Sequence, residues 1–209
     1  EASFENVSFR GDADFTSSNF EGRSNAETSA VRFDNSTFLA EAVFEDCVFQ
    51  TFSLMEAKFN RSANFSESSF IDEMVFQAAP TDDCILINFR GAELNIRRII
   101  QPKQGDTFYD MTATTVRDIN HKYNDTSESS RFELLNYFLF VETDFDGFDF
   151  SEHLGHLSRN NWIIHQFEYC NACDRNGENN TGLAVSDPAR LERTYLMAKN
   201  SADESGHRK

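Results

Sequence analysis

The sequence contains little glycine and proline, with nine and three residues among 209. This scarcity excludes a collagen-like chain and a linker composition. Apolar runs are short as well: the longest, YFLFV at 137–141, is far below the roughly 18 residues of a membrane-spanning helix. The chain starts at Glu1 with neither an initiator methionine nor a signal-like segment. We therefore expect a fragment, and a longer protein could carry a membrane segment that these residues lack.

Cysteine is too rare and too unevenly placed for a disulfide scaffold. The four residues are Cys47, Cys84, Cys170 and Cys173. Disulfide-based domains carry more cysteines at regular spacings. The pattern favours a reducing interior, so we expect a cytoplasmic protein, or one associated with a membrane if the chain is a piece of a longer protein.

Positive charge is also scarce, and lysine most of all. The chain has 35 acidic residues against five lysines and fourteen arginines, which gives a net charge of −16. This balance argues against direct binding to nucleic acid, because that requires clustered cations to displace counterions. It fits a basic partner or mimicry of a polyanion. An acid excess with few lysines is typical of proteins adapted to high salt, although an ordinary acidic protein is the alternative.

Phenylalanine is abundant, with 22 copies, and it recurs at a fixed interval. Large apolar residues stand five or six positions apart, a spacing that fits neither the helical period of 3.6 nor the strand period of 2. The residue two positions earlier is mostly small, and the residues between are polar. The two series are Phe4, Phe9, Phe15 and Phe20, and then Phe33, Phe38, Phe44, Phe49, Leu54, Phe59, Phe65, Phe70 and Phe76.

This repeat predicts a coil in which each unit forms one short side. The large residue would fill the centre, and the small one would leave it room. Four sides would close a turn of about twenty residues, and successive turns would stack through parallel backbone hydrogen bonds. Met74 is bulky where alanine or serine is usual, so we expect a local distortion there. A β-sandwich with irregular strands is the alternative.

The unit resembles the A-(D/N)-(L/F)-x-x repeat of the pentapeptide-repeat family. ADF at 13–15, ANF at 63–65 and AEL at 92–94 match it, and FRGDADF at 9–15 is similar to the glycine-aspartate phrasing of its members. The resemblance implies an all-β solenoid, namely a right-handed quadrilateral β-helix. It also implies that a member of this size and acidity could mimic duplex DNA and occupy a type II topoisomerase as a dimer.

Two regions are expected. Residues 1–150 would form the β-helix, with an irregular excursion at about 101–131 that includes one further side around Met111 to Val116. A return to the coil is predicted for 132–150, with a helix over 132–141 as its competitor. Residues 151–209 would form a helical cap or docking region that resembles the tail of archaeal and bacterial pentapeptide-repeat proteins. It would comprise a short helix, a break at Asn160–Asn161, a second short element, a loop and a final helix.

The final helix has clear boundary signals. Asp187 is suited to cap it and Pro188 to occupy its first position. Its apolar face would hold Leu191, Tyr195, Ala198 and Ala202.

A zinc site is the most specific chemical hypothesis. Two thiolates two residues apart can chelate one ion, and nearby imidazoles can complete a tetrahedron. The candidate ligands are Cys170, Cys173, His165, His153 and His156. The competing interpretation is that these are ordinary helix and loop residues. Asp144, Asp146 and Asp149 are expected to form a solvated acidic surface and not a calcium loop.

The sequence predicts a non-catalytic protein. It carries no nucleophile elbow, Walker loop, zinc-protease motif or dinucleotide fingerprint. We expect a structural scaffold whose sides bind a protein partner, with no cofactor except possible zinc and with a homodimer as one option. The alternatives are the acidic DNA mimic and a zinc- or redox-responsive module built on Cys170 and Cys173.

Overall fold

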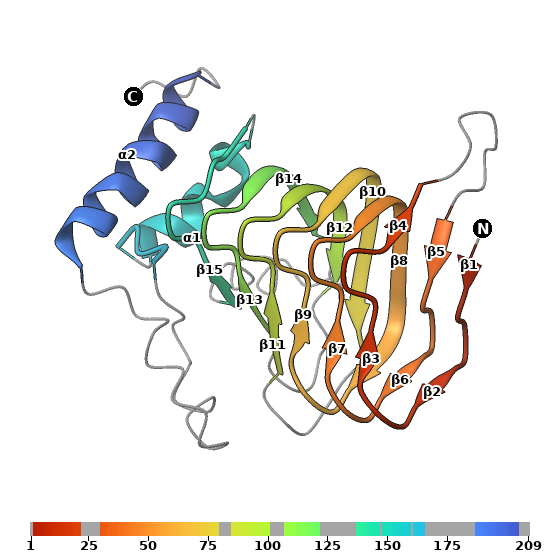
Figure 1. Ribbon diagram of the computed structural model, residues 1–209. Coiled ribbons are helices and arrows are strands. Elements are labelled where there is room, and N and C mark those ends of the chain that lie inside the picture. The colour runs from red at the N-terminus through yellow and green to blue at the C-terminus, as the bar shows by residue number, and fades with distance from the viewer. Residues whose placement is uncertain are drawn as a thin grey trace.

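The computed structural model describes residues 2–21, 30–79, 85–100, 107–121, 137–146, 148–159, 161–165 and 187–204. They form mostly parallel β-sheet with few helices (Figure 1). One sheet has the strand order β1-β5-β8-β10-β12-β14, and β2, β4 and β6 pair beside this path. The other sheet has the order β15-β13-β11-β9-β7-β3.

The first seven strands have two or three residues each, and most of the later ones are longer, although β9 and β15 have two. The strands are β1 (Ala2–Ser3), β2 (Ser8–Phe9), β3 (Ala13–Asp14), β4 (Asn19–Phe20), β5 (Ala30–Arg32), β6 (Thr37–Phe38), β7 (Ala42–Val43), β8 (Val48–Phe59), β9 (Ala63–Asn64), β10 (Ser69–Ala78), β11 (Ile85–Asn88), β12 (Glu93–Ile100), β13 (Thr107–Asp110), β14 (Thr115–His121) and β15 (Phe138–Leu139). The helical segments are η3 (Phe150–His153), α1 (Leu154–Arg159) and α2 (Pro188–Glu204).

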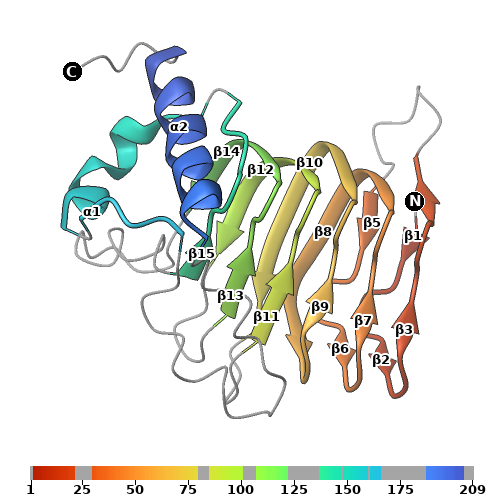
Figure 2. The ribbon, with the colours of Figure 1, turned by 60° about the vertical axis from the view of Figure 1, so that its left-hand side comes forward.

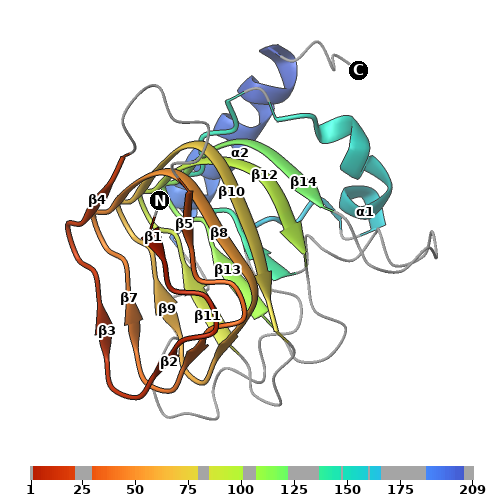
Figure 3. The same cartoon turned by 90° about the vertical axis from the view of Figure 1, so that its right-hand side faces the viewer.

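The chain passes through both sheets in stacked layers. We define the first layer as residues 2–21, the second as 30–51, the third as 52–73 and the fourth as 74–95. Each layer pairs in parallel with its neighbours: Ala13 with Ala42, Ala42 with Ala63, and Ala63 with Ile87. Figures 2 and 3 show the strands of successive layers side by side, with the helices at the end opposite β1. This arrangement is compatible with the predicted β-helix.

The core consists of four columns of inward side chains that run through the layers. In the third column, the rings of Phe15, Phe44 and Phe65 stack nearly parallel, with centroids 5.0 and 4.6 Å apart. These distances match the spacing of paired strands, about 4.7–4.9 Å. The columns are Phe4, Phe33, Leu54 and Phe76; Phe9, Phe38 and Phe59; Phe15, Phe44, Phe65, Phe89, Met111 and Phe140; and Phe20, Phe49, Phe70, Leu94, Val116 and Phe145.

We number the sides of the stack one to four after these columns. In the first four layers most side chains directly before and after a column member are exposed or half-buried, whereas those on both sides of Met111 and Phe140 are buried. The predicted inward positions are confirmed, because from the second layer onward the described column members are at most 3% exposed.

Hydroxyl and thiol groups hold the corner before the fourth side. The Thr114 hydroxyl donates to the carbonyl of Phe89 in the layer before it at 2.7 Å, and Thr143 donates to Met111 at 2.7 Å. Ser68 does the same towards Phe44. A buried carbonyl without a partner is costly, so a small side chain that can donate stabilises this corner, although Ala92 occupies the position in the fourth layer. This explains why serine and threonine recur two positions before the column residue.

Met74 marks the predicted distortion. The register of β10 against β12 shifts between Phe70 and Met74 and again between Met74 and Val75. Its register against β8 shifts between Phe70 and Glu73 and again after Gln77. Met74 itself is fully buried. The bulge in the ladder thus coincides with Met74, but Met74 pairs with buried Phe52 and Phe52 with buried Val31, so the length of the side chain does not by itself explain the bulge.

The prediction of an irregular excursion at 101–131 is wrong for the residues described in that range. β13 and β14 are parallel strands that pair with β11 and β12, with register shifts between β12 and β14, and the side predicted around Met111 to Val116 runs from the end of β13 to the start of β14. The helix alternative for 132–141 is wrong at Phe138–Leu139, which form β15. Residues 101–106 and 122–136 lie outside the described part of the chain.

The substitution Phe65→Asp tests the column directly. A charge would replace a ring that is completely buried and stacked on Phe44 and Phe89. The loss of the ring alone costs about 3–5 kcal/mol, and an unpaired buried carboxylate costs more. We expect an unfolded chain by circular dichroism.

Glu67→Gln is the matched control, since Glu67 is exposed on the same layer. Its free energy of unfolding should stay within about 0.5 kcal/mol of the parent. A folded Phe65→Asp chain would contradict the inward assignment.

Candidate functional site

The structure describes only part of the predicted zinc set. Cys170 and Cys173 lie outside the described residues. His153 ends η3 and His156 belongs to α1, but their side chains are not among those described. The side chain of His165 is described. Among the described residues, no three His, Cys, Asp or Glu side chains group closely enough to hold a metal ion.

His165 contacts the final helix. Its Nδ1 lies 2.8 Å from the hydroxyl of Tyr195 on α2. The backbone N–H of Ile164 donates to the same hydroxyl at 3.4 Å. The Tyr195 hydroxyl thus contacts both Ile164 and His165, and in the tautomer of the neutral ring that carries its hydrogen on Nε2 it would donate to Nδ1. Burial lowers the pKa of His165 and raises that of Tyr195, so both groups favour their neutral forms.

A second contact anchors the start of α2, and we call it the Glu142 clamp. One carboxylate oxygen of Glu142 accepts from Nε and Nη2 of Arg190 at 3.1 and 3.0 Å. The other accepts from Nη1 of Arg193 at 2.7 Å. The Glu142 side chain is 18% exposed, whereas that of Arg193 is 66% exposed. Bidentate pairing to a shielded carboxylate is stronger than an ordinary surface pair.

Thr194 lets α2 continue the hydrogen-bond ladder of the stack. At this corner the N–H groups of Asp46, Glu67, Gly91 and Ala113 each donate to a carbonyl of the next layer. Glu142 is the next residue in that row, and its N–H donates to the hydroxyl of Thr194 at 2.9 Å. Thr194 is fully buried. The helix therefore supplies the acceptor that a further layer would otherwise provide.

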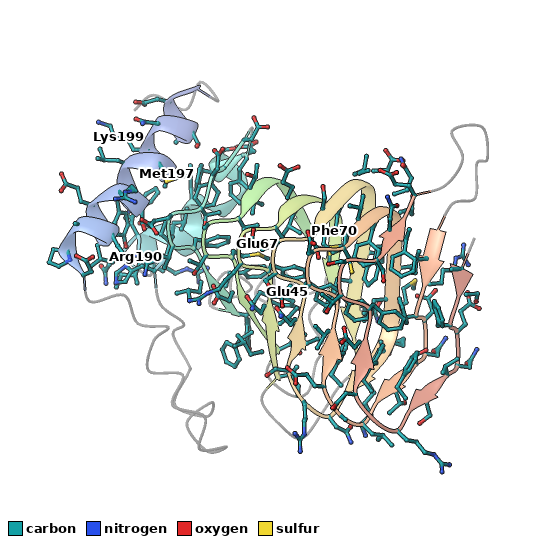
Figure 4. All side chains as sticks on the ribbon, viewed as in Figure 1. Glu45, Glu67, Phe70, Arg190, Met197 and Lys199 are labelled. Carbon is teal, nitrogen blue, oxygen red and sulfur yellow. The ribbon has the colours of Figure 1, made fainter. Side chains whose placement is uncertain are left out.

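The boundary signals of α2 act as predicted. Asp187 accepts from the N–H of Ala189 at 3.0 Å, and Pro188 is the first helical residue. Tyr195, Ala198 and Ala202 pack against the core, as predicted. Buried Thr194 was missed, because a threonine inside a helix has no local pattern that marks it as a cap for distant strands. Arg190 and Lys199 are labelled on α2 in Figure 4.

Polar side chains on side three are held in fixed positions. The carboxamide oxygen of Asn64 accepts from the N–H of Ser66 and from the side chain of Asn88 in the next layer. Asn88 accepts from the N–H of Arg90, whose guanidinium donates to Asp110 at 2.9 Å. The outward surface is thus ordered by bonds along the stack.

Charge is segregated among the sides. Within the first three layers, side two carries Arg10, Lys58 and Arg61 and no carboxylate, with Asp12 and Glu41 at its corner with side three. Sides three and four carry most of the described carboxylates of the stack, and Arg90 is the one cation among their described side chains. Glu45 and Glu67 lie over neighbouring layers in Figure 4. The exposed carboxylates are Asp14, Glu45, Asp46 and Glu67 on side three and Glu21, Asp72, Glu93, Asp144 and Asp146 on side four. Asp110 and Glu142 also belong to side three, but Asp110 is buried beside Arg90 and Glu142 is held by two arginines of α2.

Of the acidic residues near position 150, Asp149 caps a helix, and Asp144 and Asp146 are exposed on the surface. Asp149 caps η3 by accepting from the N–H of Ser151 at 2.8 Å. Asp144 pairs with Thr115 across neighbouring strands and is exposed, as is Asp146.

Cys47 acts as a corner residue. Its Sγ lies 3.0 Å from the carbonyl oxygen of Phe15, and Ser68, Thr114 and Thr143 occupy the same position in three other layers. Burial raises the pKa of this thiol, which makes it a weak nucleophile at neutral pH.

Comparison with models of known protein families found no match. Comparisons with curated proteins and with solved structures also found no match. No helix among the described residues is long and apolar enough to cross a membrane.

Glu142→Gln should loosen α2. The amide keeps the shape of the carboxylate but loses its charge, so each arginine bond weakens. We expect a loss of about 1–2 kcal/mol in the free energy of unfolding, with faster hydrogen exchange along α2. Glu192→Gln, an exposed change on the same helix, should leave both unchanged. Equal effects from the two variants would show that the clamp contributes nothing specific.

Acid should weaken the contact at His165. Its folded pKa lies below the ordinary 6.5, so the unfolded chain takes up the proton first. Neutral His165 therefore contributes fully to the free energy of unfolding above pH 6.5, and this contribution is lost as pH falls from 6.5 through the lowered pKa. A pH series of urea unfolding should show this slope in the parent chain and a smaller one in His165→Gln. Identical slopes would contradict it.

Zinc binding at Cys170 and Cys173 stays a prediction. Because Tyr195 occupies Nδ1, His165 could offer only Nε2 to a metal. Elemental analysis of the purified chain should find close to one zinc per chain if the site exists, and the double variant Cys170→Ser/Cys173→Ser should lose it. A metal-free parent after purification with added zinc would remove this hypothesis.

Proposed function

We propose that the chain is a non-catalytic scaffold whose outward sides bind another macromolecule. We also propose that its parallel layers form the right-handed quadrilateral β-helix of a pentapeptide-repeat protein. The five-residue spacing of the inward columns supports this assignment. The observation that carries the function is the segregation of charge, because side two is cationic while sides three and four are acidic.

Ordered side chains favour binding by these sides. Asn64, Asn88 and Asp110 are fixed by bonds to the backbone and to their neighbours in the stack. A partner that docks on side three would therefore freeze few additional rotamers. A lower entropy cost of this kind leaves more of the contact energy for affinity.

The chemistry of sides three and four suits a basic protein surface. Carboxylates such as Glu45, Glu67 and Glu93 are exposed, and complementary charge steers association and fixes the orientation of a partner. Such binding should weaken as salt screens the charges.

Affinity capture with side-specific variants tests this function. The acidic-side variant Glu45→Gln/Glu67→Gln/Glu93→Gln should lose a protein that the parent chain retains from a native lysate. The matched variant Arg10→Gln/Lys58→Gln/Arg61→Gln should keep it, since it changes three exposed charges on side two. Loss by both variants or by neither would contradict binding by the acidic sides.

An acidic mimic of duplex DNA is the second candidate. It is favoured by the run of carboxylates along adjacent sides in successive layers. The assay is DNA supercoiling by a type II topoisomerase with and without the chain. Inhibition by the parent that is lost in the acidic-side variant would support mimicry, and an unaffected enzyme would reject it.

A further inference from the structure

One corner of the stack has a left-handed backbone residue in successive layers. The corner joins side three to side four, and each of these residues stands two positions after a column member. Their φ angles lie between 53 and 68°, so the backbone takes nearly the same shape each time. The side chains of this corner row therefore leave the stack on the same surface. The corner row is Ser17, Asp46, Glu67, Gly91, Ala113 and Glu142.

At the end of the corner row, Glu142 already binds a helix. In the Glu142 clamp its carboxylate accepts from Arg190 and Arg193 of α2, which stand three positions apart. Residues three apart lie on the same face of a helix, so both guanidinium groups reach one carboxylate. The structure thus contains one example of a ligand for this row, which is an Arg-x-x-Arg pair on a helix.

Glu67 presents a carboxylate from the same position in the third layer. The next residue of the corner row is Gly91. A Cβ at Gly91 would collide with Oε1 of Glu67 and lie 2.7 Å from Oε2, so the carboxylate rests against the Cα of this glycine. Any larger residue at position 91 would fill the place that the carboxylate takes. The Glu67 side chain is nevertheless exposed to solvent.

The Glu67 carboxylate has no hydrogen-bond or ion-pair partner among the described residues, which cover this corner without a gap from the second to the fifth layer. The other carboxylates of the corner row are engaged: Asp46 accepts from a serine hydroxyl of the first layer at 2.9 Å, and Glu142 is held by α2. Arg90, the one described cation on sides three and four, pairs with Asp110. Glu67 is therefore the carboxylate of this row that a second molecule can bind.

We propose that Glu67 anchors the partner on side three by binding two arginines that stand three positions apart on a helix of the partner. This inference rests on the proposed function and names the chemistry of the basic surface that docks there. Arginine suits the site because its planar fork pairs bidentately with a carboxylate, whereas lysine offers a point charge. The other exposed carboxylates attract the helix and Glu67 fixes its position.

Two differences from the Glu142 clamp define this contact. The N–H of Glu67 donates to the carbonyl of Arg90 at 2.8 Å, so a partner helix needs no counterpart of Thr194 and meets the carboxylate alone. The Glu67 side chain is also exposed, whereas that of Glu142 is 18% exposed. Solvent weakens an ion pair, so the contact at Glu67 is weaker than the clamp and suits a partner that binds and leaves.

Binding of synthetic helices tests the proposal. The first probe is an alanine-based helical peptide with two arginines three positions apart. The second places the same arginines two positions apart, on different faces of the helix, and the third replaces both arginines of the first by lysine. Fluorescence anisotropy of each labelled peptide with the whole chain at 0.15 M salt gives three dissociation constants. We expect the first peptide to bind several-fold more tightly than the other two.

The variant Glu67→Gln should abolish this preference, so that the three peptides bind with nearly equal dissociation constants. Glu41→Gln is the matched control, since it removes an exposed carboxylate at the opposite corner of side three, in the layer before. It should keep the preference. Both variants should retain the circular dichroism spectrum of the parent, because both side chains are exposed.

Three outcomes would overturn the proposal. They are equal or absent binding of the three peptides by the parent chain, a preference that persists in Glu67→Gln, and a preference that both variants lose. None of them decides the proposed function, because diffuse attraction by the acidic sides could still retain a basic partner. That function fails separately, when the triple acidic-side variant and its matched variant retain the same proteins.

Discussion

Stacking of phenylalanine rings at the spacing of paired strands is the interaction on which the rest of the structure depends. Parallel rings pack at nearly the same distance that backbone hydrogen bonds set between strands, about 4.7–4.9 Å. One phenylalanine per column in each layer therefore allows the rings to stack and the strands to pair at the same spacing. Where the column residue changes to Leu54 or Leu94, the position stays buried and the strands stay paired. Shape and register thus matter more than aromaticity, and the outward residues are left to vary.

Such a stack satisfies its own backbone everywhere except at its two ends. The chain treats the ends differently. At one end α2 supplies a hydroxyl and two arginines to Glu142. In the first described layer, the rings of Phe4, Phe9, Phe15 and Phe20 are only partly buried.

The sequence predicted the inward columns because they depend on local spacing alone. The sequence did not reveal β13 and β14, because the inward positions there are filled by residues other than phenylalanine. Met111 and Val116 continue two of the columns, and Tyr109 stands two positions before Met111, where a small residue is usual. The start of α2 was predictable from Asp187 and Pro188. The contacts of Glu142 with Arg190 and Thr194 were not, because they join residues about fifty positions apart and no local pattern marks them.

The fixed register has a consequence for how such a chain can change in length. Inserting one residue within a side would turn its column residue outward and expose an apolar side chain. Inserting a whole layer would keep every column intact, since each layer contacts only its neighbours. Growth and loss in this protein are therefore expected in units of one layer.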